Sequence, residues 1–134
     1  MKNKYPISNE FKKFANFTPS LNATYLAMAK MIMHPPKFLW TDSALQVEKR
    51  KISGYEKGEI EILILSPDNL PDKAPCLVYF HGGGFVLEAA GCHYALAMRY
   101  AKEGGCKVIF VQYRLAPQVV FPVPQEDCLN PCNS

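Results

Sequence analysis

The chain has 134 residues, enough for one folded domain and too few for two ordinary ones. Hydrophobic residues make up 49% of it and charged residues 20%, which is typical of a globular protein rather than a disordered one. The formal net charge is +3, and residues 1–60 carry ten Lys or Arg against five acidic residues. These basic residues form only short runs without interleaved aromatic residues. We therefore interpret them as a solvated helical surface and expect no nucleic-acid partner.

Five cysteines are scattered along the chain without the CxxC spacing of a structural zinc site, so we expect no metal and a reducing, cytoplasmic compartment. Cys76 and Cys106 lie in apolar runs, where a free cysteine acts as a small hydrophobic residue, and both are expected to be buried. The charged start of the chain is not followed by the apolar core of a signal peptide. Lys30 and the prolines after His34 interrupt the most apolar stretch, so no membrane span is expected.

Residues 1–42 are predicted to form a helical N-terminal segment. The first helix is expected over residues 9–16, after a serine that can cap it. The second begins with Thr-Pro, carries apolar residues at helical spacing over residues 18–34, and ends at a Pro-Pro pair because proline lacks the amide hydrogen. Residues 43–134 are predicted to be the core.

Strands are expected after residue 43, where the hydrophobic period changes. Residues 44–52 alternate imperfectly between apolar and charged, as an exposed strand does, and two glycines in residues 53–58 favour a hairpin connection to a strand over residues 59–65. Residues 76–80 are apolar without alternation, which predicts a strand covered on both faces.

A helix is expected over residues 89–103, ended by Gly-Gly, and another continuous apolar strand over residues 106–111. Two buried strands joined by a helix form a βαβ unit. We therefore predict an α/β fold with a mixed, partly parallel sheet of about four strands and one crossover helix. Residues 125–129 can begin one more helix, which Pro131 stops.

Three glycines follow the predicted strand over residues 76–80, in the sequence YFHGGGF of residues 79–85. Glycine accepts positive φ and lets a ligand approach the backbone. Backbone amides at this end of a strand can hydrogen-bond an oxygen as its negative charge develops, which is what an oxyanion hole requires. A plain flexible turn is the alternative. A phosphate-binding loop would need GxxxxGK[ST] or GxGxxG, and neither the lysine nor the spacing is present.

A second landmark, QYRLAPQ at residues 112–118, follows the next apolar strand, with Phe-Pro at residues 121–122 and Glu-Asp at residues 126–127. In this order the segments resemble the esterase/lipase branch of the α/β-hydrolases, typified by hormone-sensitive lipase and bacterial acetyl esterases. The resemblance covers about residues 44–128, and the helical N-terminus loosely. It implies the N-terminal portion of that fold and a small ester of short to medium acyl chain as substrate, hydrolysed without metal or cofactor.

The resemblance also implies residue roles. The backbone amides of Gly83 and Gly84 are the implied oxyanion donors, and Gly82 gives the loop its bend. His81 would brace the loop, since the catalytic base of this family lies near the C-terminus.

Arg114, with Glu126 and Asp127, would hold the loop after the strand by charge-assisted hydrogen bonds. The N-terminal helices would form part of a lid over the acyl pocket. The lid residues placed to touch substrate, or to pack within the lid, are Met28, Ile32 and Trp40.

The sequence departs from the family pattern in two ways. Gln112 and Gln118 stand where the family has Asp and Glu, which removes two carboxylates from the loop. None of the six serines lies in GxSxG, and neither His34 nor His93 follows a plausible nucleophile. Without a nucleophile covalent acyl transfer has no first step, so the chain alone is expected to be inactive.

Three hypotheses follow from this pattern. The chain is the front of an interrupted or truncated esterase gene. Alternatively, it is a short protein that completes its sheet with a partner chain, or forms a homo-oligomer through the open edge of the strand over residues 76–80. The third hypothesis is a noncatalytic binding module that keeps the glycine loop for an anion.

Overall fold

The computed structural model describes residues 8–14, 24, 28, 43–129 and 131. Its elements are the 3-10 helices η1 (Asn9–Phe14) and η3 (Tyr55–Lys57), the strands β1 (Leu45–Ser53), β2 (Glu59–Pro67), β3 (Cys76–Phe80) and β4 (Lys107–Gln112), and the helices α2 (Gly91–Gly104) and α3 (Val123–Leu129). The first predicted helix is thus a short 3-10 helix in its described part. The second predicted helix, over residues 18–34, lies outside the described residues apart from two isolated positions.

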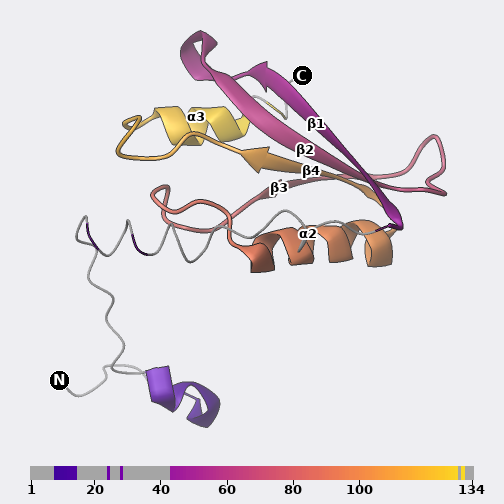
Figure 1. The fold of residues 1–134 in the computed structure, drawn as a ribbon, viewed down its shortest axis with the longest axis horizontal. Helices are drawn as coiled ribbons and strands as arrows, with labels where there is room; N and C mark the ends of the chain where they lie inside the picture. The colour runs from indigo at the N-terminus through magenta and orange to yellow at the C-terminus, as the bar shows by residue number, and fades with distance from the viewer. Residues whose placement is uncertain (1–7, 15–23, 25–27, 29–42, 130, 132–134) are drawn as a thin grey trace.

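The four strands form one mixed sheet in the order β1-β2-β4-β3 (Figure 1). The pairs β1–β2 and β2–β4 are antiparallel, and β3–β4 is parallel. The expected βαβ unit is therefore confirmed, since β3, α2 and β4 follow one another in the chain. The glycines predicted to close the first hairpin do so around η3, where the amide of Gly54 donates to the carbonyl of Gly58 over 2.6 Å.

Helix α2 covers one face of the sheet. Leu63, Val108 and Phe110 on that face have no exposed surface and belong to the same apolar cluster as Ala97 and Ala101 of the helix. The two alanines allow the helix to pack closely, because they add no bulk between its backbone and the strands. The helix ends as the Gly-Gly signal predicted: Gly105 is left-handed (φ 56°) and its amide donates to the carbonyl of Ala101.

The opposite face carries a second apolar cluster formed by Ile60, Ile62, Val111 and Tyr113, with Cys128 of α3 packed against it. Helix α3 lies over the end of the sheet that η3 also occupies (Figure 1). The rest of this face has no described helix over it. Helix α2 therefore covers the centre of one face of the sheet. Among the described helices, only α3 covers the other face, and only at one end.

The expectation that the strand over residues 76–80 is covered on both faces is wrong. Cys76, predicted to be buried, is exposed, and the side chains of Leu77 and Phe80 are 37% and 40% exposed. The physical reason is that β3 is an edge strand, with β4 on one side and no described strand on the other. Cys106, directly before the inner strand β4, is 8% exposed, which confirms the prediction for that residue.

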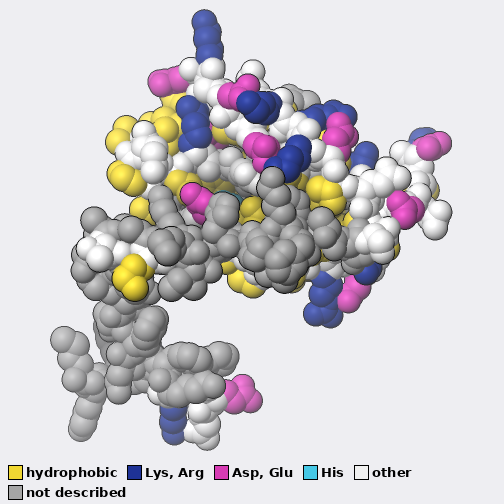
Figure 2. All heavy atoms as spheres, in the orientation of Figure 1, with side chains coloured by type: hydrophobic (Ala, Val, Ile, Leu, Met, Phe, Trp, Pro, Cys, Tyr) yellow, Lys and Arg dark blue, Asp and Glu magenta, His cyan; other side chains and the backbone are white. Residues whose placement is uncertain are grey.

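The basic residues of β1 are paired with acidic ones. Lys49 lies 3.2 Å from Glu61, and Arg50 lies 2.7 Å from Glu48. Exposed pairs of this kind contribute between zero and about 1 kcal/mol each, so they do little for stability. Figure 2 shows the two signs of charge intermixed over the described surface in that view. In the part of the chain that the structure describes, no helix has the length and apolar character needed to cross a membrane.

Candidate functional site

The glycine loop, residues 82–84, follows β3 directly and has a backbone that other residues rarely adopt. Gly83 has φ 138° and Gly84 has φ 61°. The carbonyl of Gly83 accepts the amides of Val86 and Leu87 over 3.2 and 3.1 Å, which turns the chain back on itself. A Cβ atom on Gly83 would lie 2.5 Å from the carbonyl oxygen of Leu87. Glycine is therefore required at position 83 by both its φ and its closest neighbour.

The amides of the glycine loop have no acceptor within the described part of the chain: Gly82, Gly83 and Gly84 donate no hydrogen bond there. The loop lines a hollow of about 380 Å³ together with Phe80, Tyr113 and other, mostly apolar, residues. Such amides, fixed by a turn and open to a mostly apolar hollow, can bind a negatively charged oxygen without first breaking another hydrogen bond.

Tyr113, directly after β4, holds the residue that precedes the glycine loop. Its hydroxyl donates to the carbonyl of His81 over 2.6 Å, and the two rings stack with centroids 4.4 Å apart. Tyr113 and His81 meet because β3 and β4 are parallel neighbours, so their carboxyl ends lie at the same edge of the sheet. Burial raises the pKa of Tyr113 to about 12, so this hydroxyl stays protonated and remains a donor.

His81 is 6% exposed and supports the glycine loop through a hydrogen bond to its first residue, Gly82. Its Nδ1 lies 2.8 Å from the carbonyl oxygen of Gly82, and because a carbonyl can only accept, Nδ1 carries the proton. Burial lowers the pKa of the His81 imidazole below its usual 6.5, so the ring is neutral at neutral pH. The ring thus fixes the first glycine without adding a charge to the loop.

Arg114 and Asp127 form an ion pair in which the carboxylate is fully buried and the Arg114 side chain is 27% exposed. The Arg114 Nε lies 2.8 Å from Oδ2 of Asp127 and its Nη2 lies 2.8 Å from Oδ1. Asp127 has no exposed surface and also accepts the amides of Tyr55 and Arg114 over 2.9 and 3.2 Å. Burial alone would raise the pKa of the Asp127 carboxyl, but the hydrogen bonds from Arg114 and from the two amides outweigh it and lower the pKa.

The turn around η3 makes room for this ion pair. A Cβ atom on Gly58 would overlap the Arg114 guanidinium, whose Nη2 also donates to the carbonyl of Tyr55 over 2.8 Å. The neighbouring acid behaves differently from Asp127: among the described residues, the side chain of Glu126 makes no hydrogen bond or ion pair. Of the two acidic residues that the sequence singled out here, the structure brings only Asp127 to Arg114.

The segment after β4 also contacts the glycine loop through its backbone. The amide of Ala116 donates to the carbonyl of Phe85 over 2.8 Å, and the ring of Phe85 meets Tyr113 edge-on with centroids 5.6 Å apart. Phe85 itself has a positive φ of 61°, so the turn continues past the glycines. The two sequence landmarks therefore form one structural unit, in which the segment after β4 supports the segment after β3.

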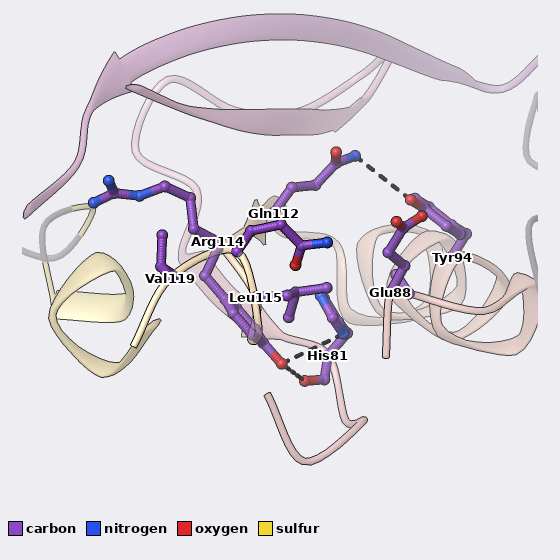
Figure 3. Close-up of a pocket in the computed structure, with 10 residues that line it drawn as sticks. His81, Glu88, Tyr94, Gln112, Arg114, Leu115 and Val119 are labelled. Carbon is purple, nitrogen blue, oxygen red and sulfur yellow. Dashed lines mark hydrogen bonds between the residues drawn. The ribbon is translucent and has the colours of Figure 1, made fainter. Parts of the chain in front are cut away.

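A second hollow, of about 350 Å³, is also lined by His81 and is drawn in Figure 3. Gln112 and Gln118 both line it, and the Gln112 side-chain amide donates to the Tyr94 hydroxyl over 3.5 Å. Figure 3 shows the Arg114 side chain directed away from Tyr94. No amide of the glycine loop lines this hollow, so the one beside the glycines is the candidate reaction site.

Motifs in the sequence assign no individual role to two residues of the site. Tyr113 lies one residue after the parallel neighbour of β3, which is the signal for its place beside His81. His93 stands at the third position of α2 and accepts the amide of Ala90. Among the predicted lid residues Met28 is 58% exposed, whereas Ile32 and Trp40 lie outside the described residues. No cluster of metal-ligating side chains exists in the described part.

Residues 77–134 match the model of a protein family described as having the α/β-hydrolase fold. The chain therefore has the α/β-hydrolase fold, represented here by a four-stranded part of its sheet and two helices.

Among solved structures, an esterase from Pyrobaculum calidifontis superimposes with a TM-score of 0.69 at 28% identity, covering 96% of this chain and 42% of the esterase. Among curated proteins, arylacetamide deacetylase-like 3 of Homo sapiens is 44% identical over 79 residues, which are 58% of this chain and 19% of the human protein. Carboxylesterase NlhH of Mycobacterium tuberculosis is 30% identical over 101 residues, which are 75% of this chain and 31% of the bacterial protein. The chain thus spans less than a third of the length of these curated relatives.

Proposed function

We propose that these residues supply the oxyanion-binding part of a carboxylic ester hydrolase. The observation that carries the proposal is the pair of amides of Gly83 and Gly84, which have no acceptor in the described chain and lie in a turn with a backbone that other residues rarely adopt. When a nucleophile attacks an ester carbonyl, the oxygen becomes negatively charged. Amides already directed at that oxygen stabilise the charge without reorganisation. Similarity to named esterases supports ester substrates in particular.

The remaining chemistry belongs to groups outside these 134 residues. Hydrolysis by this family needs a serine on GxSxG, then an acid and a histidine, and the present sequence has no GxSxG. We therefore propose that the chain is an N-terminal part of the enzyme and is inactive alone. Reading the gene beyond the codon for Ser134 tests this directly. A GxSxG followed by Asp and His codons supports the proposal, and their absence in all frames contradicts it.

Anion binding by the loop is testable in the chain itself. Acetate carries the charge of the developing oxyanion on a carboxylate of similar size, so it is a suitable probe. Titration of the ¹⁵N-labelled protein with acetate should shift the amide resonances of Gly83 and Gly84 in a saturable way. As a control, the amide of Gly105, which ends α2 in a left-handed conformation far from the loop, should not respond. No saturable shift at Gly83 and Gly84 would contradict the proposed function.

A second candidate is an assembly module that completes its sheet with a partner or a second copy. The observation in its favour is the edge strand β3, with the exposed side chains of Leu77 and Phe80. Unpaired edges of this kind add strands from other chains. Sedimentation should then give a defined oligomer that Leu77→Lys dissociates, whereas Gln46→Lys on the opposite edge strand β1 leaves it intact. A monomer, or aggregates without defined stoichiometry, would count against assembly.

A further inference from the structure

His93, in the first turn of α2, is hydrogen-bonded to the end of the segment that connects β3 to this helix. Its Nδ1 lies 2.9 Å from the amide nitrogen of Ala90. A backbone amide can only donate, so Nδ1 is the acceptor and the neutral ring carries its proton on Nε2. His93 thus occupies the position at which Glu or Gln completes a capping box, and it makes the same bond to the backbone of the residue before the helix.

The opposite edge of the His93 ring faces the start of the same segment. A Cβ atom placed on Gly82 would lie 3.6 Å from Nε2, and the ring centroid is 5.9 Å from that of His81. Because Gly82 has no side chain, the imidazole can lie beside its backbone. In the described part of the chain Nε2 has no hydrogen-bond partner. One ring therefore meets both ends of the connection, at Gly82 and at Ala90.

We propose that His93 is the positioning residue of the glycine loop. By binding the amide of Ala90 while its ring lies beside Gly82, it sets the separation between the two ends of the connection, and with it the direction of the amides in between. The inference rests on the proposed function, since it concerns the same anion-binding loop. Tyr113 holds His81 from the side of β4, and His93 binds the Ala90 amide and lies beside Gly82 on the side of α2. The loop is thus fixed from both of its neighbouring elements.

Two substitutions separate the contacts of the ring. His93→Gln keeps an acceptor for the amide of Ala90, because glutamine serves at this position in capping boxes, but it removes the ring from Gly82. His93→Leu keeps apolar bulk near Gly82 and removes the acceptor. Arg99→Gln is the matched control, because Arg99 is on the same helix and its side chain is exposed, in an ion pair with Glu103. Far-UV circular dichroism should show the same helix content in His93→Gln and the control.

The measurement is acetate titration of the ¹⁵N-labelled 134-residue chain, followed at Gly83 and Gly84, together with hydrogen exchange of these two amides. We expect both His93 variants to bind acetate more weakly than the wild type, and His93→Leu to do so by about fivefold, the size typical for loss of a single capping contact. Their Gly83 and Gly84 amides should also exchange faster, since the loop then samples more conformations. Arg99→Gln should match the wild type in both respects.

The two proposals fail in different ways. If acetate shifts Gly83 and Gly84 equally in the wild type, both His93 variants and the control, with equal exchange, then His93 does not position the loop and the proposed function stands. If acetate shifts neither amide in the wild type, the proposed function fails. In that case exchange decides the positioning role: faster exchange in the His93 variants than in Arg99→Gln supports it, and equal exchange overturns it.

Discussion

The guanidinium of Arg114 meets the carboxylate of Asp127 with two parallel hydrogen bonds, Nε to Oδ2 and Nη2 to Oδ1, each 2.8 Å long. Bidentate contacts of this kind are among the stronger polar interactions in proteins. The same carboxylate accepts the amide of Tyr55, so three segments far apart in the sequence meet at one buried acid. This arrangement makes Asp127 the polar residue whose loss should cost the most stability.

Replacing Asp127 by alanine should destabilise the protein by about 3 kcal/mol, the lower end of the usual cost for a buried ion pair, because the Arg114 side chain is 27% exposed and can be solvated. The substitution leaves the Arg114 guanidinium and two backbone amides without their acceptor. Urea unfolding followed by circular dichroism measures the loss. Glu126→Ala is the matched control and should change stability by less than about 0.5 kcal/mol, because the Glu126 side chain has no partner among the described residues. Equal effects of the two substitutions would contradict the assigned role of Asp127.

The same residue should make stability depend on acid pH. The pKa of Asp127 in the folded protein is lowered from its usual 3.8, so the folded state favours the ionised carboxylate. Its contribution is therefore complete above that usual value and is lost as the pH falls through the lower, folded-state pKa. Thermal unfolding between pH 7 and pH 2 should show a decline that is shallower in Asp127→Asn, which cannot ionise. Parallel declines in the two proteins would mean that another group controls acid stability.

Gly83 should tolerate alanine far less than another glycine of positive φ. At Gly83 the new Cβ would lie 2.5 Å from a backbone carbonyl oxygen, whereas at Gly105 it would meet nothing within 4 Å. Gly105→Ala should therefore cost only the left-handed conformation, about 1–2 kcal/mol. Gly83→Ala adds a clash with backbone that has to move, so it should cost more and abolish the acetate response of the loop. Both effects can be measured by urea unfolding and by NMR titration.

Removing the hydroxyl of Tyr113 should loosen the connection between β4 and the glycine loop. Tyr113→Phe keeps the ring that stacks on His81 and deletes the 2.6 Å hydrogen bond to its carbonyl. A buried hydrogen bond contributes about 1 kcal/mol, and the His81 carbonyl that is left without its donor adds to the cost. We therefore expect the free energy of unfolding to fall by about 1–2 kcal/mol. Tyr100→Phe, in the half-exposed ring on α2, is the control. If both variants unfold at the same urea concentration, the bond does not stabilise the fold.

Much of the architecture could be predicted from the residues because local signals and burial agreed. The glycine pair after α2, the hairpin glycines and the continuous apolar run of β4 each had one favourable structure, and each formed it. The face burial of β3 could not be predicted in this way. An apolar run reports which side chains favour burial, not which neighbours are there to bury them, and β3 is at the edge of the described sheet.

Only those features of the site that depend on motifs along the chain could be predicted from the sequence. The glycine loop and the acidic partner of Arg114 followed from motifs, whereas the hydrogen bond from Tyr113 to His81 depends on which strands are neighbours. That neighbour relation is set by a parallel pairing between segments some thirty residues apart, and no local pattern encodes it. The role of His93 is hard to predict because Glu or Gln is the usual residue at this position of a capping box, and only the spacing of three residues from Ala90 points to it.

The strand order also has a consequence for how the chain folds. The strand β4 lies between β2 and β3 and pairs with both, although it comes after them in the sequence. Until residues 107–112 have left the ribosome, only the β1–β2 hairpin can form, and β3 has no described strand to join. Folding of the sheet is therefore a late and largely non-local event, of the kind that proceeds slowly. Strand β2 ends at residue 67 and β3 at residue 80, whereas β4 begins at residue 107, so during synthesis the apolar residues of both strands wait uncovered for the strand that joins them.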